Sequence, residues 1–575
     1  MPRADGTSVQ RGPWSIMIGS AIFAVLLATA CESPAQTVAQ GLQVDEEPTT
    51  VRGTVVNAIT HAPIARALVL TPGNTGAMMT DGEGHFEFTL PKSGTEVQFH
   101  TFGPTSLIAR KPGFLDDPNN RSQVDVTPST EITVALLPEA LIKGRVISSE
   151  TDPTPGISVQ LFSRQVQNGM PKWVQMGETR ANSNGEFRFA ELLPGTYKLL
   201  SNESMDNDPV TTIPGGQQYG FPPVYYPGVS DFAAAGTIQL TAGQTVQADL
   251  PLTRQPYFPV KIPVANLEPN AFNVTVSVQG HRGPGYSLGY NAQNQQIEGL
   301  LPNGNYLVEA ASYGQNSVGG SAHLAVAGAP AEGPSLTLTP FSSINVHVVE
   351  EFTATDWQGS VFGSNVGRHP IPVHGPRLYL QISAESADDF QQGGAGLRPP
   401  TGPNDDSFVL QNVAPGRYWL RLHSSRGYVA AATMGGVDVL HQPLIVSPGS
   451  STPIEVTMRD DMAELDGTVA GITQPTVSGS KMSHLMPQPQ AWIYCVPLPD
   501  STGQFQQLWV SPDGKINSWQ MTPGAYRVLA FANQQPNLPF RDPEAMRAYE
   551  SKGQVVHLAA GQKTSVQLQL ISGIE

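Results

Sequence analysis

The sequence has few cysteines, few charged residues and almost no long amphipathic helical pattern. Only two cysteines, Cys31 and Cys495, occur in 575 residues, and Cys31 lies at the end of a targeting segment. One remaining cysteine cannot build an intramolecular disulfide framework, so each domain must be stabilised by its own apolar core. Without long helical periods, the α-helical fold classes are excluded.

Basic residues are too few for a nucleic-acid partner. The chain has 32 Lys and Arg against 48 Asp and Glu, a formal net charge of −16. Nucleic-acid binding needs a basic face, which this balance argues against. The acidic residues are spread along the chain rather than gathered in a tail, which favours a role in solubility.

Catalytic motifs are also scarce. The one H-x-x-E pair, His347 and Glu350, lies in an alternating strand pattern where the two side chains would face opposite sides. The G-x-S-x-G match at 285–289 is flanked by loop signals and predicts a turn, not a nucleophile elbow. Cys495 lies in an apolar strand pattern and is predicted to be a buried structural thiol. We therefore expect no enzyme, no cofactor and no metal site.

Calcium is the one ion that the sequence leaves open. The turns at 81–83 and 116–120 cluster oxygen ligands that could hold Ca²⁺. Asp and Asn in turns more often bond their own backbone, and that alternative is favoured here.

One short sequence motif recurs along the chain. Its clearest copy, Asn184–Leu199, predicts turn, strand, turn, strand, with positive φ at Gly185 and a type II turn at Pro194-Gly195. The copies are marked by Pro91, Pro194, Pro302, Pro415 and Pro523. These prolines lie 103 to 113 residues apart, the length of a small domain.

Four copies continue with a tyrosine. We expect Tyr197, Tyr306, Tyr418 and Tyr526 to occupy equivalent, largely buried positions. A turn that positions two strands is needed in every copy of a domain, whereas a catalytic site is needed once. The repetition therefore indicates architecture.

Short alternating strands separated by Gly and Pro turns predict an all-β protein. The chain contains 57 glycines and 51 prolines. Five tandem antiparallel β-sandwich domains are expected, over residues 48–138, 139–255, 256–341, 342–459 and 460–575. Strands that end one domain run almost directly into the next, so we expect semi-rigid joints. One short helix is predicted over Asp542–Ser551, packed on the last sheet through Met546 and Tyr549.

The first expected domain carries a family pattern. It reads G-x-V at Gly53–Val55, P-I-x-x-A-x-V at Pro63–Val69, and T-D-x-x-G-x-F-x-F at Thr80–Phe88. This order resembles the carboxypeptidase regulatory-like domain of bacteria, a transthyretin-like seven-stranded sandwich with a carbohydrate-binding-like fold. The second expected domain repeats it, and the remaining three keep mainly the P-G-x-Y block.

The resemblance implies accessory modules rather than a peptidase. A zinc peptidase would need about 300 residues of α/β sequence, which the chain lacks. The fold of the family makes glycan the first ligand to test. Fold alone does not establish function.

The first 30 residues resemble an export signal. Arg3 and Arg11 precede an apolar run over Ile16–Leu27, and Ala28–Ala30 gives an A-x-A cleavage pattern. We expect residues 31–47 to form a flexible tether. An uncleaved membrane anchor and lipidation at Cys31 are the alternatives. We expect an exported protein: periplasmic, outer-membrane-attached or extracellular, with a membrane contact only through an N-terminal lipid or anchor.

The best binding candidate is an insertion in the second expected domain. It is rich in aromatic residues and proline over Gly220–Val229, and supplies Phe221, Tyr225 and Tyr226 as a platform for sugars or proline-rich peptides. Trp173 and Trp357 are weaker candidates. The alternative is that these rings pack on the edge of the sandwich.

These observations favour an exported, non-catalytic multi-domain binding protein with a glycan or a cell-envelope protein as partner. The alternative is a structural spacer or adhesin stalk with protein partners. A hydrolase with an unfamiliar site is the remote alternative.

Overall fold

The computed structural model divides into two units, Met1–Pro48 and Thr49–Glu575. It describes residues 50–571 except 71–76, 90–106, 117–130, 149–155, 207–214, 267–273, 281–284, 315, 355–373, 389–393, 473–490, 500, 512–513 and 518–519. The expected signal segment, the tether and Cys31 lie outside the described residues, as does Trp357.

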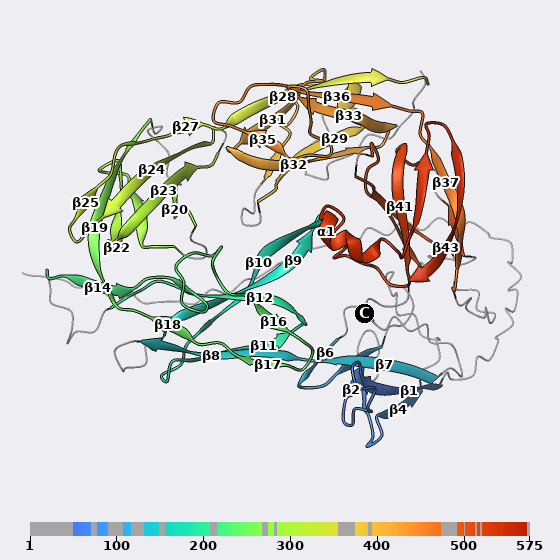
Figure 1. Cartoon of the computed structure of the whole chain (residues 1–575), viewed down its shortest axis with the longest axis horizontal. Coiled ribbons are helices and arrows are strands. Elements are labelled where there is room, and N and C mark those ends of the chain that lie inside the picture. The colour runs from blue at the N-terminus through green and yellow to red at the C-terminus, as the bar shows by residue number, and fades with distance from the viewer. Residues whose placement is uncertain are drawn as a thin grey trace, which may run out of the picture. The chain divides into compact units, whose positions relative to one another are not determined.

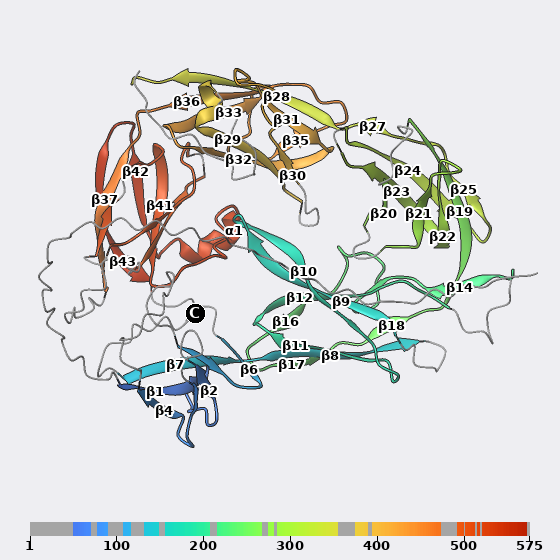
Figure 2. The ribbon, with the colours of Figure 1, turned by 180° about the vertical axis from the view of Figure 1, so that it is seen from behind.

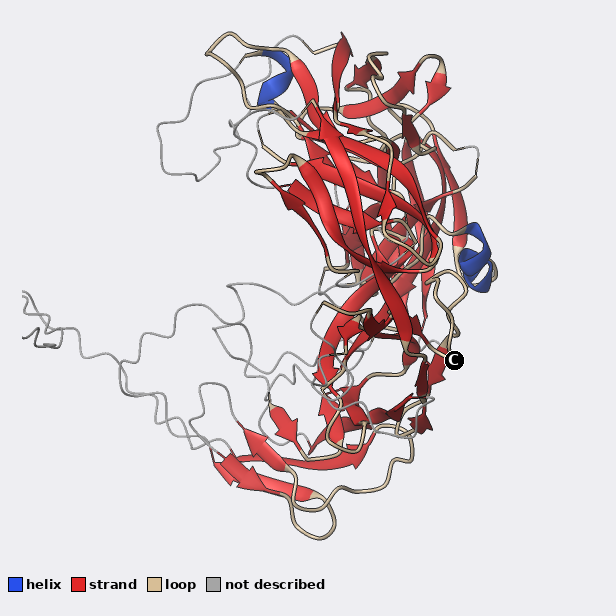
Figure 3. Ribbon diagram, turned by 90° about the vertical axis from the view of Figure 1, so that its left-hand side faces the viewer, coloured by secondary structure: helices blue, strands red, loops and turns tan. Residues whose placement is uncertain are grey.

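The all-β prediction is confirmed. Strands make up most of the described chain, and its α-helix α1 (Pro543–Met546) is a single turn (Figure 3). Two short 3₁₀ helices, η2 (Gly375–Leu378) and η3 (Arg547–Tyr549), accompany it. None of the helices within the described ranges is long and apolar enough to cross a membrane.

Five successive stretches each enclose a hydrophobic core and are called sandwiches 1 to 5. Sandwich 1 contains β1 (Thr50–Asn57), β2 (Leu68–Leu70), β3 (Ala77–Met79), β4 (His85–Thr89), β5 (Ile108–Arg110), β6 (Phe114–Asp116) and β7 (Glu131–Pro138). Sandwich 2 contains β8 (Ala140–Ser148), β9 (Ser158–Gln167), β10 (Met170–Arg180), β11 (Glu186–Leu192), β12 (Gly195–Ser201), β13 (Ser204–Met205), β14 (Gln218–Phe221), β15 (Val224–Tyr225), β16 (Ile238–Leu240), β17 (Thr245–Gln247) and β18 (Leu250–Leu252).

The other three sandwiches follow in chain order (Figure 1). Sandwich 3 contains β19 (Gln255–Ala265), β20 (Val274–Val278), β21 (Leu288–Asn291), β22 (Gln296–Pro302), β23 (Gly304–Ser312), β24 (Val318–Val326), β25 (Ala331–Glu332), β26 (Leu336–Thr337) and β27 (Thr339–Pro340). Sandwich 4 contains β28 (Ser342–Glu351), β29 (Leu380–Ser386), β30 (Gly394–Gly396), β31 (Phe408–Val413), β32 (Gly416–Ser424), β33 (Tyr428–Met434), β34 (Val437–Asp438), β35 (Leu444–Val446) and β36 (Ile454–Arg459). Sandwich 5 contains β37 (Glu464–Ala470), β38 (Trp492–Pro497), β39 (Gln506–Trp509), β40 (Lys515–Asn517), β41 (Gly524–Phe531), β42 (Gln554–Leu558) and β43 (Lys563–Ile571).

One pairing scheme recurs in all five. The first strand of each sandwich pairs antiparallel with a strand of the repeated sequence motif. It also pairs parallel with a strand near the end of the same sandwich. The antiparallel pairs are β1–β4, β8–β11, β19–β22, β28–β31 and β37–β40. The parallel pairs are β1–β7, β8–β17, β19–β25, β28–β36 and β37–β43. The five-domain division remains a prediction, and this recurrence is the observation that supports it.

The glycine of the G-x-V pattern has a packing role. Gly53 pairs with Phe86 across β1 and β4, and Gly144 pairs with Phe187 across β8 and β11. A Cβ on Gly53 would lie 2.5 Å from the Phe86 ring, and one on Gly144 would lie 2.7 Å from the Phe187 ring. Only glycine leaves room for the ring and for the closing strand behind it.

The prediction for the four tyrosines is confirmed. Tyr197, Tyr306, Tyr418 and Tyr526 have exposed fractions of 5%, 7%, 4% and 0%. Each hydroxyl donates to the carbonyl oxygen four residues earlier, at 2.5 to 2.9 Å. This is the hydrogen bond of a tyrosine corner, which fixes the passage of the chain between two sheets.

The predicted type II turn at Pro194-Gly195 is wrong. Gly195 does not have a left-handed φ, and its counterparts Gly416 and Gly524 have φ of 159° and 157°, far from the value of about +80° that a type II turn needs. Close packing explains the glycine in one copy but not at Gly195 itself, where an added Cβ would lie 3.5 Å from the Tyr197 ring, an ordinary contact. A Cβ on Gly304 would lie 2.8 Å from the Tyr306 hydroxyl, because the corner tyrosine folds back over this position.

The expected short joints and the expected helix are both present. One residue separates β7 from β8, two separate β18 from β19, and four separate β36 from β37. The Asp542 side chain accepts hydrogen bonds from the backbone N–H groups of Glu544 and Ala545 and so caps α1. Met546 and Tyr549 are buried against Tyr494 and Phe531 of the last sheet, as predicted.

Candidate functional site

The insertion of sandwich 2 extends the sheet of sandwich 3. Strand β14, within the insertion, pairs antiparallel with β19: Gln218 lies opposite Tyr257, and Gly220 lies opposite Gln255. Strand β13 pairs with the other edge of β14. The sheet of sandwich 3 therefore runs in the order β13-β14-β19-β22-β21. Figure 2 shows β14 beside β19. We call the pairing of β13–β14 with β19 the ladder joint.

The aromatic residues proposed as a ligand platform are mostly buried. Phe221, Tyr225 and Trp173 have exposed fractions of 9%, 0% and 5%, and Tyr226 is half-buried. Phe221 and Tyr226 pack on the core of sandwich 2. A sugar needs an exposed ring face to stack on, and three of the four rings do not offer one. Ligand binding by these residues remains an untested prediction.

Tyr225 and Trp173 belong to a second, smaller cluster in sandwich 2. Both rings meet Phe232 edge to face, with centroids 5.5 and 5.8 Å apart. The Lys198 ammonium lies 5.0 Å from the Trp173 ring and 4.6 Å from the Phe232 ring, and donates to the Phe232 carbonyl at 2.8 Å. The cluster joins the insertion to its own sandwich, and the sequence did not show that Phe232 would be at its centre.

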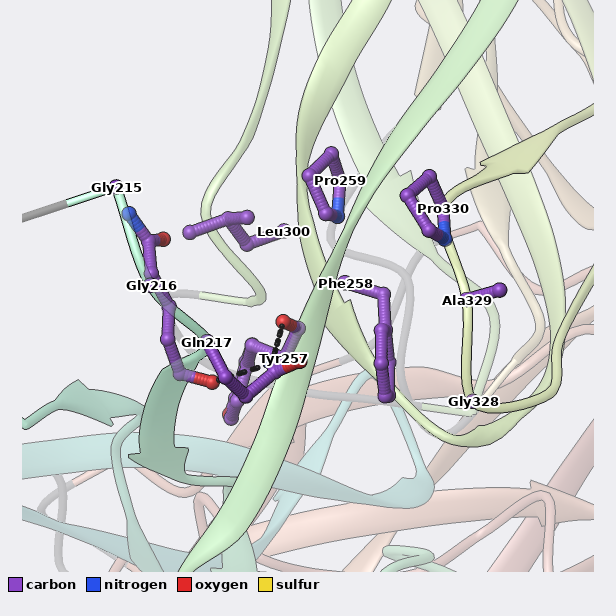
Figure 4. Close-up of a pocket in the computed structure, with 11 residues that line it drawn as sticks. Gly215, Gly216, Gln217, Tyr257, Phe258, Pro259, Leu300, Gly328, Ala329 and Pro330 are labelled. Carbon is purple, nitrogen blue, oxygen red and sulfur yellow. Dashed lines mark hydrogen bonds between the residues drawn. The ribbon is translucent and has the colours of Figure 1, made fainter. Parts of the chain in front are cut away.

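A cavity of about 410 Å³ lies at the ladder joint. Its lining comes from four segments: 215–218, 257–259, Leu300 and 328–330. Figure 4 shows the Gln217 amide within the lining. Its Nε2 donates to the carbonyls of Gln218 and Tyr257, at 2.8 and 2.7 Å. The eleven lining residues include no carboxylate, imidazole, thiol or amine, so the cavity has no acid–base chemistry to offer near neutral pH.

A carboxylate directly before β13 binds sandwich 3. Glu203 Oε2 accepts hydrogen bonds from the Ser287 backbone N–H at 2.7 Å and from its hydroxyl at 2.6 Å. Burial raises the pKa of the Glu203 carboxyl above its ordinary value of 4.5, and the hydrogen bonds from Ser287 partly oppose that shift. The Tyr286 ring meets Tyr306 edge to face at 5.5 Å. Glu203 therefore reaches a residue next to the tyrosine corner of sandwich 3.

The G-x-S-x-G match is a turn, as predicted. Ser287 directly precedes β21, so a strand rather than a helix follows it. Its hydroxyl donates to a carboxylate, whereas a serine nucleophile is paired with an imidazole or amine base. This environment does not activate Ser287.

The other candidate groups have structural partners. In β28, His347 Nδ1 lies 3.0 Å from Glu455 Oε1, whereas Glu350 accepts a hydrogen bond from the Tyr379 hydroxyl. Among the residues that the structure describes, no three His, Cys, Asp or Glu side chains meet in a group that could hold a metal ion. The Cys495 thiol is fully buried, as predicted, and burial raises its pKa to about 12.

The first acidic turn bonds its own backbone. Asp81 Oδ1 accepts hydrogen bonds from the N–H groups of Glu83 and His85, at 2.9 and 2.8 Å. These bonds, with that from His85 as the largest cause, lower the pKa of the Asp81 carboxyl. Most of the second acidic turn, residues 117–120, lies outside the described residues.

No protein-family model matches the sequence, and no curated protein matches it. The resemblance to the carboxypeptidase regulatory-like domain therefore has no family model behind it.

Solved structures give weak likenesses. The Bacillus anthracis TIE protein is 13% identical over 51% of this chain and 51% of its own, with a TM-score of 0.16. GBS52, the minor pilin of Streptococcus agalactiae, is 13% identical over 36% of this chain and 97% of its own, with a TM-score of 0.19. The pilus adhesin SpaC from Lactobacillus rhamnosus GG is 12% identical over 51% of this chain and 44% of its own, with a TM-score of 0.16. This chain thus spans about half the length of the TIE protein, and likeness at this level carries no argument about function.

Proposed function

We propose that the chain is an exported, non-catalytic scaffold, a spacer or adhesin stalk that holds β-sandwiches in series and uses protein partners. The observation that carries the proposal is the ladder joint. The strand that leads into the segment with the strongest signature of a ligand site pairs by its backbone with the next sandwich, from Gln218 to Gly220.

A ladder joint suits a scaffold because it resists bending. Backbone hydrogen bonds between β14 and β19 add to the two-residue connection between β18 and β19, so sandwiches 2 and 3 are joined twice. Gln217 and Glu203 add side-chain hydrogen bonds to sandwich 3. Two connections restrict a hinge that one flexible linker would allow.

The surroundings of the candidate catalytic groups support a non-catalytic role. Ser287 is hydrogen-bonded to a carboxylate and Cys495 is buried with a raised pKa, so neither is prepared for nucleophilic attack. The likenesses to pilin and adhesin structures concern those proteins and are too weak to support the proposal.

Binding assays on the full chain separate this proposal from its rivals. The chain is photo-crosslinked to cell-envelope proteins and, in parallel, applied to a broad glycan array. The scaffold predicts reproducible protein crosslinks and no glycan binding. Glycan binding that disappears in Tyr226→Ala and persists in Tyr226→Phe would restore the carbohydrate hypothesis. Turnover of peptide, ester or glycoside substrates would overturn the non-catalytic assignment.

A further inference from the structure

The hairpin of β9 and β10 has a tip that contacts residues far away in the sequence. Its two-residue turn is Asn168-Gly169, with φ of 50° and 79°, the two positive values that a type I′ hairpin turn requires. Its strands, of ten and eleven residues, are long enough to carry the turn beyond the core of sandwich 2.

The tip of the hairpin contacts polar groups of β29 in sandwich 4. The Asn168 side-chain amide donates to both carboxylate oxygens of Glu385 at 2.7 Å. The Lys172 ammonium donates to the Ser386 carbonyl at 2.6 Å and lies 3.8 Å from Glu385 Oε1. Lys172 is 7% exposed, so this contact buries a charge.

Sandwich 5 holds the same turn from the loop before α1. The Arg541 backbone N–H donates to the Gly169 carbonyl at 3.1 Å. The Phe540 ring covers Gly169 so closely that a Cβ there would lie 2.7 Å from it. The Arg541 guanidinium lies 4.7 Å from the Trp419 ring of sandwich 4.

The burial of two cations limits the stability of this contact. Lys172 is buried and Arg541 is half-buried, and desolvation lowers the pKa of the Arg541 guanidinium. The cost of removing cations from water offsets much of what their hydrogen bonds and ring contacts contribute. Few residues and mostly polar groups make the contact, as in transient interfaces between domains.

We propose that the turn Asn168-Gly169 is a reversible clasp: sandwiches 4 and 5 hold it through Glu385, Ser386 and Phe540–Arg541, and release it while the ladder joint stays formed. The proposal goes beyond the scaffold function, since it adds a held and a released form of the same folded chain. The contacts of the clasp lie outside the five core clusters, although Phe540 also packs against the smaller cluster that contains Tyr494 and Phe531.

Hydrogen exchange of the full chain, followed by mass spectrometry of peptides, tests the clasp. The reporter is the Arg541 amide, which the Gly169 carbonyl protects in the held form. We expect the peptide around Arg541 to exchange more slowly than exposed loops, and at least about tenfold faster than peptides from β9 and β12, because release precedes global unfolding. Exchange as fast as in an exposed loop, or as slow as in the core strands, would overturn the proposal.

Two matched substitutions assign the protection to the tip. Gly169→Val should accelerate exchange around Arg541 about tenfold or more, because the new side chain meets Phe540. Gly436→Val is the control, since Gly436 is also a hairpin-turn glycine with φ of +82°, but a Cβ added to it would meet no atom within 4 Å. Equal exchange around Arg541 in both variants would contradict the clasp. If Gly169→Val does not fold, Lys172→Met replaces it, with the same expected acceleration.

Discussion

Sandwich 2 makes two long-range contacts of different kinds. At the ladder joint, backbone strands pair, and Gly220, Phe221 and Tyr257 are buried. At the clasp, one turn meets a carboxylate, a carbonyl and a ring. The ladder joint is held by backbone hydrogen bonds between uncharged groups, whereas the clasp withdraws cations from the water that solvates them well. The comparison shows why two contacts of one domain should differ in permanence.

The largest expected loss of folding stability comes from disrupting the ladder joint at Gly220. A Cβ there would lie 3.0 Å from the Ser204 carbonyl and 3.0 Å from the Tyr257 ring, so Gly220→Val overpacks the joint. We expect a loss of about 1–3 kcal/mol in the free energy of unfolding, measured by urea denaturation. Gly289→Val in β21 is the matched control, because a Cβ added to Gly289 would meet no atom within 4 Å. Equal stability of the two variants would remove the argument for a packed joint.

A smaller effect is expected from the tyrosine corners. Tyr418→Phe removes one hydrogen bond, to the Ala414 carbonyl, and should cost about 1 kcal/mol. Tyr306→Phe removes the equivalent bond to Pro302, and should cost at least as much because the Tyr306 hydroxyl also has a hydrogen bond with Tyr286 next to the joint. Thermal and urea unfolding of both variants measure the difference. If Tyr306→Phe loses clearly less free energy of unfolding than Tyr418→Phe, the joint does not stabilise the tyrosine corner beside it.

The pH dependence of the ladder joint follows from Glu203. Because burial raises its pKa in the folded chain, its stabilising contribution is complete below its ordinary value of about 4.5 and is lost as pH rises through the folded pKa. Glu203→Gln should therefore reduce the difference in melting temperature between pH 4.5 and pH 7.5. The neighbouring tyrosines do not titrate in this window, since burial raises the pKa of both Tyr257 and Tyr286. An unchanged or larger difference in Glu203→Gln would contradict this assignment.

The smallest effect on global stability is expected at the clasp. Asn168→Ala removes the amide that bonds Glu385 at an exposed position, and should change the free energy of unfolding by about 0.5 kcal/mol or less. The same variant should still accelerate exchange around Arg541. A large global loss would mean that the clasp is a permanent interface, which would remove the contrast with the ladder joint.

Local patterns predicted the elements that depend on neighbours in sequence. Alternation and turn residues gave the strands, the spacing gave the four buried tyrosines, and Asp542 with Pro543 gave the capped helix α1. The type II turn failed because glycine occurs both with a positive φ, as at Gly185, and without one, as at Gly195, and a sequence does not distinguish the two.

Non-local partners could not be predicted in the same way. The rings of Phe221 and Tyr225 are apolar whether a ligand or a protein core covers them, so the sequence could not decide between these. The Asn168-Gly169 dipeptide is a strong hairpin signal, but its partner Glu385 lies 217 residues away. Nothing in the local pattern of either segment indicates that contact.

The central claim is that β14 belongs to the sheet of sandwich 3, and hydrogen exchange of the β14 amides tests it most directly. In the full chain, the peptide over Gln218–Phe221 should be protected to within about tenfold of peptides from β19 and β22. Protection should be lost in Gly220→Val and kept in Gly289→Val. Rapid exchange of Gln218–Phe221 while β19 and β22 stay protected would contradict the ladder joint and the scaffold built on it.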